Sequence, residues 1–444
     1  MCATDEVRPR KILKRRMVVA SAWYTCSLVV AVACAQGGGT PRFVTEHEWA
    51  GRGEWIRADT HMHTRASDGG QTIAALVARA GEHGCQAVAI TDHADRELRA
   101  ATPEYFAGIA AARAAHPDLV ILAGLEWNVP PSGGDEHATV LVGQDATEGE
   151  ILAEFKRRWD DYDRGNEDIL RAEDALLWLA DATAGASVRP VVVYNHPSRA
   201  DATSLSNADD MTRWRGANDL FIGFEGAPGH QGKPPIGAYQ GKVEPIDRWD
   251  PVVATPGDAW DTLLQHGLDV HGALATSDFH NDNPRGLNDY WPCAFAETWF
   301  YVPERTAAGV LRAMRAGTFF GAHGHIARDV ELTMTAEGLA RAAMVGETIQ
   351  VAAGTTLTAS VTLTVPGTDF EGKPNQIDAV EVVVVTPTEV SERGHEVSGT
   401  GPQAIRETIV AGESAVVVRA RVRRVVPEGP DLLAYTNAIR IQVR

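Results

Sequence analysis

Short apolar runs, each followed closely by His, Asp or Glu, recur between residues 55 and 280 of this chain. The run 87–90 precedes Asp92 and His93, and the run 273–275 precedes Asp278. Each run reads as a strand buried on both faces, and helical patterns separate the runs. The carboxyl ends of parallel strands meet at one edge, so the polar residues that follow them gather there. This pattern restricts the chain to an α/β fold with a polar site at one end of its strands.

The segment His61-Met62-His63 carries the strongest chemical signal. Because side chains alternate along an extended segment, both imidazoles point to the same side of the strand. Asp68 follows in a turn-forming stretch that can fold its carboxylate back beside them. Imidazole and carboxylate are the usual ligands of zinc, manganese and iron. The repetition of such clusters at successive strand ends therefore predicts a metal site.

Single histidines have a simpler explanation, because a lone strand-end histidine is more often a structural hydrogen-bonding group than a ligand. The pair His323 and His325 resembles a second His-x-His motif but follows the last predicted helix of the barrel. We interpret these two residues and His271 as structural. Histidines late in helices, where a positive charge is favoured, have the same interpretation: His83, His116 and His266.

The motifs, taken in order, resemble the polymerase and histidinol phosphatase (PHP) superfamily over roughly residues 55–325. The matching motifs are Asp59-x-His61-x-His63, Ser67-Asp68-Gly69, Thr91-Asp92-His93, Gly124-x-Glu126, His137, Asn195-His196-Pro197 and Ser277-Asp278-x-His280. The resemblance implies a distorted (β/α)7 barrel with two or three divalent metal ions, Zn2+, Mn2+ or Fe2+. It also implies hydrolysis of phosphate esters. The secreted branch similar to carbaryl hydrolase is the nearest match, because of the leader and the C-terminal tail described below.

The resemblance further implies nine metal ligands. The first metal ion would be held by His61, His63, Glu126 and Asp278. The second would share Glu126 as a bridge and add His137 and His196. The third would be held by Asp68, His93 and His280. Asp68 stands where some members of the family have histidine.

Several residues near these motifs are candidates for supporting roles. Asp92 adjoins a predicted ligand, and we expect it to orient imidazoles and raise their basicity. Arg199 and Arg285 follow ligands on loops and can bind a phosphoryl group bidentately, although each can equally be a surface arginine paired with an acid. Glu225 and His230 fall at a strand end, where they either contact substrate or shape the loop. We take His230 as a candidate for protonation of the leaving group.

The leading functional hypothesis is an exported metal-dependent phosphoesterase. Two or three cations would bind one water, lower its pKa and hold it as a bridging hydroxide nucleophile. The first alternative is a carboxyl-ester or carbamate hydrolase on the same site, which an apolar mouth formed by Trp127, Trp214, Tyr290 and Trp291 would favour. The second is a non-catalytic surface binding protein with a structural metal site. Ligands on loops and a shared carboxylate favour an open catalytic site over a closed structural one.

The chain divides into four predicted segments. Residues 1–36 read as a signal peptide or lipoprotein leader, with a basic start followed by the uncharged apolar run 17–35. Cys34 is a candidate for lipidation, and an uncleaved membrane anchor is the alternative. Residues 37–54 form a linker, and residues 55–326 form the barrel. In residues 327–444 apolar residues alternate with period two, as in 355–365, which predicts a small all-β sandwich-like domain.

The amino-acid composition restricts the classes of partner that the chain is expected to bind. The net charge of −18 disfavours nucleic-acid binding and suits an exported protein, in the periplasm or at the cell surface, that acts on a small-molecule ester. Of the five cysteines, Cys85 and Cys293 lie within the predicted barrel, and the sequence does not show whether they pair. The sequence does not predict an oligomeric state.

Overall fold

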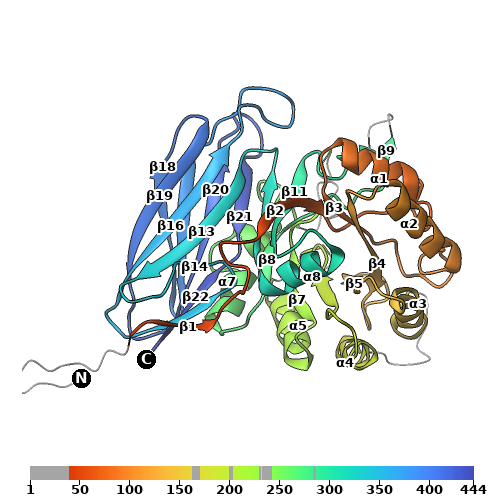
Figure 1. The fold of residues 1–444 in the computed structure, drawn as a ribbon, viewed down its shortest axis with the longest axis horizontal. Helices are drawn as coiled ribbons and strands as arrows, with labels where there is room; N and C mark the ends of the chain where they lie inside the picture. The colour runs from red at the N-terminus through yellow and green to blue at the C-terminus, as the bar shows by residue number, and fades with distance from the viewer. Residues whose placement is uncertain (1–39, 163–170, 200–203, 230–231, 233–242, 284–286) are drawn as a thin grey trace, which may run out of the picture. The chain divides into compact units, whose positions relative to one another are not determined.

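The computed structural model describes residues 40–162, 171–199, 204–229, 232, 243–283 and 287–444 (Figure 1). The predicted leader and the candidates His230 and Arg285 lie outside the described residues. In the described ranges, no helix has the length and apolar character required to span a bilayer. Export and membrane attachment therefore stay predictions.

A curved run of nine strands carries the predicted strand-end motifs. In spatial order these strands are β12 (Phe319–His323), β11 (Ala296–Val302), β2 (Glu54–Asp59), β3 (Ala87–Ile90), β4 (Val120–Asn128), β5 (His137–Leu141), β6 (Val191–Tyr194), β7 (Phe221–Ala227) and β8 (His271–Ala275). The last strand returns to the second, because Thr298 Oγ1 on β11 accepts from Ala275 N and donates to Ala275 O on β8, each at 2.9 Å.

The strands pair in a mixed pattern. The pairs β2–β3, β3–β4, β6–β7 and β7–β8 are parallel, as the βα units predict. β5 is antiparallel to both β4 and β6, which departs from uniform parallel units. The physical reason is the short connection 129–136, since a parallel strand would need a crossover connection of a dozen or more residues. β11 is antiparallel to β2 and β12.

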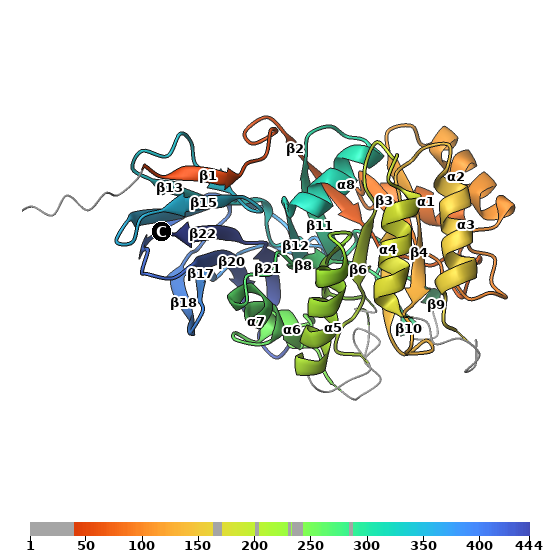
Figure 2. The same ribbon diagram turned by 90° about the horizontal axis from the view of Figure 1, so that it is seen from below.

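Helices stand beside these strands (Figure 2). They are α1 (Ile73–Glu82), α2 (Pro103–Ala115), α3 (Glu148–Trp159), α4 (Ala172–Ala182), α5 (Ser204–Ala217), α6 (Pro251–Ala254), α7 (Ala259–Gln265) and α8 (Ala307–Ala316). α1 illustrates why they form: the Thr72 side chain caps its first turn by accepting from Ala75 N, and the spacing of Leu76, Val77 and Ala80 buries one stripe against the strands. The chain is therefore a mixed α/β protein.

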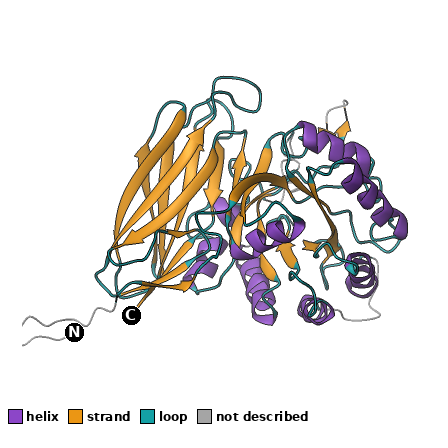
Figure 3. Ribbon diagram, in the orientation of Figure 1, coloured by secondary structure: helices purple, strands orange, loops and turns teal. Residues whose placement is uncertain are grey.

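Strands dominate after residue 327 (Figure 3). One group extends the large sheet and comprises β15 (Thr348–Val351), β17 (Ala379–Thr386), β18 (Glu389–Glu396), β20 (Val416–Arg424), β21 (Leu432–Thr436) and β22 (Ile439–Val443). β1 (Arg42–Thr45), from before the curved run, joins this group by pairing antiparallel with β15. A separate sheet comprises β14 (Ala343–Met344), β13 (Arg328–Ala336), β16 (Thr356–Val365) and β19 (Gly401–Val410). A two-stranded ribbon comprises β9 (Asp282–Asn283) and β10 (Leu287–Asn288).

The expected alternation of apolar and polar residues is visible in β16, where Leu357, Ala359, Val361 and Leu363 are buried and their neighbours are more exposed. The strands of residues 327–444 are continuous with those of the first part, because β21 pairs antiparallel with β12. The predicted boundary at residue 326 thus falls between strands that belong to one sheet. Whether it separates two domains that fold independently stays a prediction.

A disulfide joins Cys85, just after α1, to Cys293, just before β11, across a sequence separation of 208. Both cysteines are buried. The structure therefore answers a question that the sequence left open. The bond ties the loop that precedes β11 to the turn between α1 and β3.

A buried ion pair connects strand β20 of the large sheet to helix α7. Arg419 on β20 donates to Asp261 on α7 through Nε at 3.1 Å and through Nη2 at 3.0 Å. Both residues are 1% exposed, and the guanidinium lies 4.7 Å from the ring centroid of Trp260. A bidentate pair in this setting leaves an uncompensated buried charge when one partner is removed.

We expect Arg419→Ala to lower the free energy of unfolding by about 3–5 kcal/mol, because Asp261 would remain buried without its cation. Arg157→Ala is the matched control, since Arg157 forms an exposed pair with Glu154 and its loss should leave the free energy of unfolding nearly unchanged. Urea unfolding followed by circular dichroism measures both. Equal, small changes in the two variants would contradict this account of the contact between β20 and α7.

Candidate metal centre

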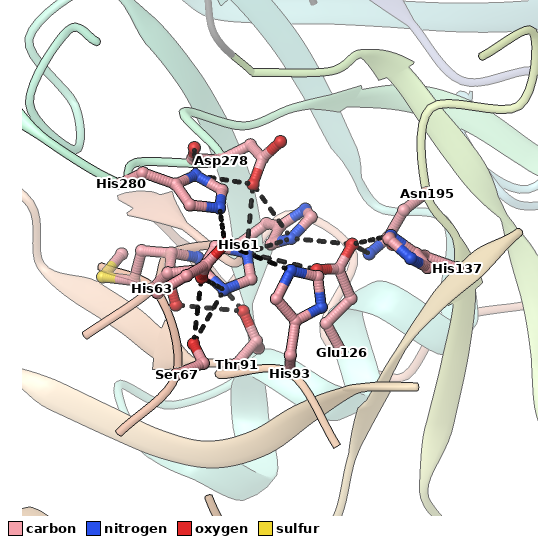
Figure 4. A network of polar contacts seen from close by, with 12 residues as sticks. His61, His63, Ser67, Thr91, His93, Glu126, His137, Asn195, Asp278 and His280 are labelled. Atoms are coloured by element: carbon pink, nitrogen blue, oxygen red, sulfur yellow. Dashed lines mark hydrogen bonds and ion pairs between the residues drawn. The ribbon is translucent and has the colours of Figure 1, made fainter. Parts of the chain in front are cut away.

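The nine predicted ligands lie together at the ends of the strands, and Figure 4 labels all of them but Asp68 and His196. His61 and His63 follow β2, His93 follows β3, and Glu126 lies on β4. His137 begins β5, which runs in the opposite direction, so it also lies at this end. The remaining ligands are Asp68 in the loop after β2, His196 after β6, and Asp278 and His280 after β8.

The donor atoms form three overlapping groups, within each of which all atoms lie within 4.8 Å of one another. The groups are His61, His63 and Asp278; His93, Glu126 and His137; and His63, Asp68, His93 and His280. All donors are imidazole nitrogens or carboxylate oxygens, the set that zinc, manganese and iron accept. The donor chemistry and spacing therefore fit divalent cations. Relative to the expected assignment, His63 and His93 each belong to two groups instead of one, and Glu126 belongs to one instead of two. His196 belongs to none of the three groups and reaches the cluster through Glu126 Oε1, at 3.3 Å.

Glu126 lies at the centre of the cluster and is 1% exposed. Its Oε1 lies 3.0 Å from His137 Nδ1 and 3.3 Å from the Nε2 atoms of both His196 and His61. Its Oε2 lies 3.0 Å from His93 Nδ1 and 3.2 Å from His63 Nε2. One carboxylate thus contacts five imidazoles, with both of its oxygens facing predicted ligands.

Asn195 holds this carboxylate in place. Its Nδ2 donates to Glu126 Oε1 at 2.9 Å, and its Oδ1 accepts from Thr139 N on β5 at 3.1 Å. The sequence marked Asn195 as part of a motif but gave it no role. The structure shows that it fixes the orientation of Glu126 between β5 and β6.

The electrostatics of the cluster follow from burial and proximity. Burial alone would raise the pKa of Glu126, but charge interactions with His137, His93 and His61 hold that pKa well below its usual range. Burial would lower the pKa of His63, whereas hydrogen bonds with Asp278 and Glu126 raise it to about 10. Burial lowers the pKa of His196 to about 3. In the metal-free protein the buried carboxylates are therefore balanced by protons on some of the imidazoles.

Asp59 is a supporting residue to which the sequence assigned no role. It is fully buried, and its carboxylate accepts from Ser277 N at 3.1 Å and from His61 N at 3.2 Å. These bonds tie the end of β2 to the end of β8, which carry four of the ligands between them. The first position of the Asp59-x-His61-x-His63 motif was the signal that could have indicated it.

Two ligands have unusual backbone conformations. His196 has φ of 30° and Asp278 has φ of 43°, in the left-handed region that non-glycine residues rarely occupy. Such conformations cost free energy and persist only where the surrounding structure holds them. Their occurrence at two of the nine ligands is consistent with a functional site.

Asp92 stabilises the turn that follows His63 by hydrogen bonds, and it does not contact an imidazole directly. Its Oδ1 accepts from Thr64 N at 2.7 Å and from Ser67 Oγ at 2.6 Å, and its Oδ2 accepts from Thr64 Oγ1 at 2.7 Å. Ser67 Oγ in turn lies 3.4 Å from His63 Nδ1. Asp92 therefore shapes the turn that follows His63, and its effect on the imidazole passes through Ser67.

The other candidates separate into two sets. Arg199 lies at the edge of the metal centre, because its Nη1 is 3.1 Å from His137 Nδ1. His323 lies apart from the donor groups and stacks on Phe295 at a centroid distance of 4.9 Å. His325 contacts the carbonyl oxygen of Cys293 at 3.0 Å and also lies outside these groups.

Comparisons with known proteins support the resemblance in part. Residues 59–190 match the family model of the PHP domain, which supports the PHP superfamily for this chain. No curated protein matches the chain. Residues 59–190, which match the PHP model, contain six of the nine predicted ligands: His61, His63, Asp68, His93, Glu126 and His137.

Three solved structures are similar to the chain at low identity. A two-domain protein from Bacteroides vulgatus that contains a predicted PHP-like metal-dependent phosphoesterase is 15% identical, with 87% of this chain and 95% of that chain covered and a TM-score of 0.41. A protein from Bifidobacterium adolescentis, described as a candidate metal-dependent phosphoesterase, is 20% identical, with 51% and 89% covered and a TM-score of 0.29. An amidohydrolase from Chromobacterium violaceum is 19% identical, with 50% and 87% covered and a TM-score of 0.28. These likenesses are too distant to assign an activity to the chain.

We expect metal uptake at pH 7 to release protons. The pKa of His63, raised to about 10, leaves its imidazole protonated in the metal-free protein, and a cation binds only the neutral form. Metal affinity should accordingly weaken as the pH falls. Calorimetric titration with Mn2+ in two buffers of different ionisation enthalpy counts the protons, with His116→Gln as a control outside the cluster. Identical heats in the two buffers would contradict this description.

Proposed function

We propose that the protein is an exported metal-dependent phosphoesterase of the secreted, carbaryl hydrolase-like branch. The proposal includes a distorted (β/α)7 barrel for the first part of the chain, followed by an all-β domain, and a mouth where the nine ligands hold two or three cations. When bound, such cations activate a water and take up charge on a phosphoryl oxygen. The observation that carries the choice of a phosphate ester is the guanidinium of Arg199 at the His137 edge of the cluster.

Different residues of the chain have different roles in the proposed reaction. Glu126 and Asp278 supply the buried negative charge that holds cations, and Asn195 keeps Glu126 oriented. Arg199 binds a phosphoryl oxygen of the substrate, since a guanidinium matches phosphate geometry and charge. In this proposal Arg285 provides a second cationic contact and His230 protonates the leaving group.

The cluster has one accessible side, which supports catalysis over a closed structural metal site. The side chain of Asp68 is 52% exposed, and those of His93 and His280 are 18% and 16% exposed. His61, His63 and Glu126 lie deeper, with side chains at most 2% exposed. A structural site is ordinarily closed by protein ligands on all sides.

A neutral aromatic ester is less well supported than a phosphate ester. Trp127 is fully buried, donates from Nε1 to Trp159 O at 2.7 Å and packs edge-on against Phe155. Trp214 is buried against Tyr194. Two of the four aromatic residues expected at the mouth therefore belong to the core, which weakens the carboxyl-ester or carbamate alternative.

Export is supported by the disulfide. Structural disulfides persist in oxidising compartments and are rare in the cytosol. The bond between Cys85 and Cys293 thus agrees with the basic and apolar leader and with a location in the periplasm or at the cell surface. Attachment to the membrane through lipidated Cys34 or an uncleaved leader is part of the proposal.

We expect Mn2+- or Zn2+-dependent release of phosphate from a phosphomonoester or phosphodiester, abolished in Glu126→Gln. Arg199→Ala should lower kcat/KM for the phosphate ester about 10- to 100-fold, equivalent to about 1.4–2.7 kcal/mol, and leave cleavage of an aryl carboxyl ester within about twofold.

Arg328→Ala, which removes an arginine with a 55% exposed side chain, is the control and should match the unmodified protein. Cleavage of the aryl ester without release of phosphate would favour the carboxyl-ester alternative over the phosphoesterase. Bound metal without turnover of any substrate would favour the surface binding protein.

A further inference from the structure

Glu225, on β7, is a buried carboxylate behind the metal centre and is 1% exposed. Its Oε1 lies 2.8 Å from His61 Nδ1 and accepts from Thr276 Oγ1 at 3.0 Å. Its Oε2 accepts from the backbone N of His196 at 3.3 Å. One carboxylate therefore joins the segments that follow β2, β6 and β8.

This contact determines which nitrogen of His61 faces the other ligands. A carboxylate accepts hydrogen bonds, so Nδ1 of His61 carries a proton and Nε2 presents its lone pair when the ring is neutral. Nε2 lies 3.1 Å from His63 Nε2 and 3.3 Å from both Glu126 Oε1 and Asp278 Oδ1. The lone pair is thus directed into the donor group.

At Nδ1 of the other imidazoles, the carboxylates within reach are themselves predicted ligands: Glu126 for His93 and His137, Asp68 for His63 and Asp278 for His280. Nδ1 of His280 contacts the carbonyl oxygen of Asp278 at 2.9 Å, and Nδ1 of His63 contacts Ser67 Oγ at 3.4 Å. Glu225, by contrast, lies outside the nine predicted ligands and contacts the imidazole of His61 at 2.8 Å. A negatively charged partner makes an imidazole a stronger ligand than a neutral partner does.

We infer that Glu225 is a positioning residue of the metal centre, which fixes the ring and tautomer of His61 and strengthens its donation to a divalent cation. The inference rests on the proposed function, because it requires that the centre bind a cation. A role as a ligand does not fit, since Glu225 contacts Nδ1 of His61 while the opposite nitrogen, Nε2, faces Glu126 and Asp278. A role in contact with substrate does not fit either, because its oxygens are engaged by His61, Thr276 and the backbone of His196.

The test compares Co2+ binding by the full chain and by Glu225→Gln, measured from the d–d absorption bands of the ion. Glu225→Gln should raise the Kd for Co2+ about 10- to 100-fold and alter the absorption bands, since the charged partner of one ligand is lost. Glu297→Gln is the matched control, because Glu297 is equally buried in the same sheet and pairs with Arg57. It should lower Tm but leave the Kd within about twofold.

The outcomes separate this inference from the proposed function. Unchanged affinity and bands in Glu225→Gln, with a loss of Tm like that of Glu297→Gln, would make Glu225 purely structural. If Glu225→Gln does not fold, Thr276→Val provides the test, because it removes one hydrogen bond to Glu225. This variant should raise the Kd for Co2+ about threefold or more. An unchanged Kd would overturn the inference. Absence of Co2+ binding by the unmodified chain overturns both. Binding without ester turnover overturns the proposed function alone.

Discussion

The structure depends on one concentration of charge, the Glu126 carboxylate in contact with five imidazoles. A buried carboxylate is costly unless cations or donors surround it. The imidazoles can meet it only if strands distant in sequence end at one place, so the curvature of the sheet and the charge of the cluster constrain each other. Asn195 and Asp59 use backbone and side-chain hydrogen bonds to hold those ends together.

The scaffold around this cluster is built to resist displacement of the strand ends. The disulfide fixes the loop before β11, and β11 pairs with β2, which leads to His61. On the other side of the sheet, Arg419 ties β20 to α7, the helix that precedes β8. Metal centres require ligands placed within a few tenths of an ångström, and rigid elements supply that precision better than loops do. The strands after residue 327 therefore contribute to the site by bracing the sheet that carries it.

The sequence predicted what depends on local pattern. His61 and His63 were identifiable because a period of two places them on one face, and Asp278 because it follows an apolar strand. What depends on contacts between distant segments was not predictable: the antiparallel direction of β5, the pairing of Cys85 with Cys293 and the contact of Glu225 with His61. A buried tryptophan and one at a barrel mouth have the same local sequence signal, so Trp127 was expected at the mouth.

Anomalous diffraction from crystals grown with Mn2+ tests the central claim most directly. The account predicts two or three anomalous peaks, each about 2.0–2.3 Å from donors of the three groups, with Glu126 between two of the ions. Ordered density for all nine side chains without a peak among them would contradict the account. So would a peak beside His323 and His325 instead.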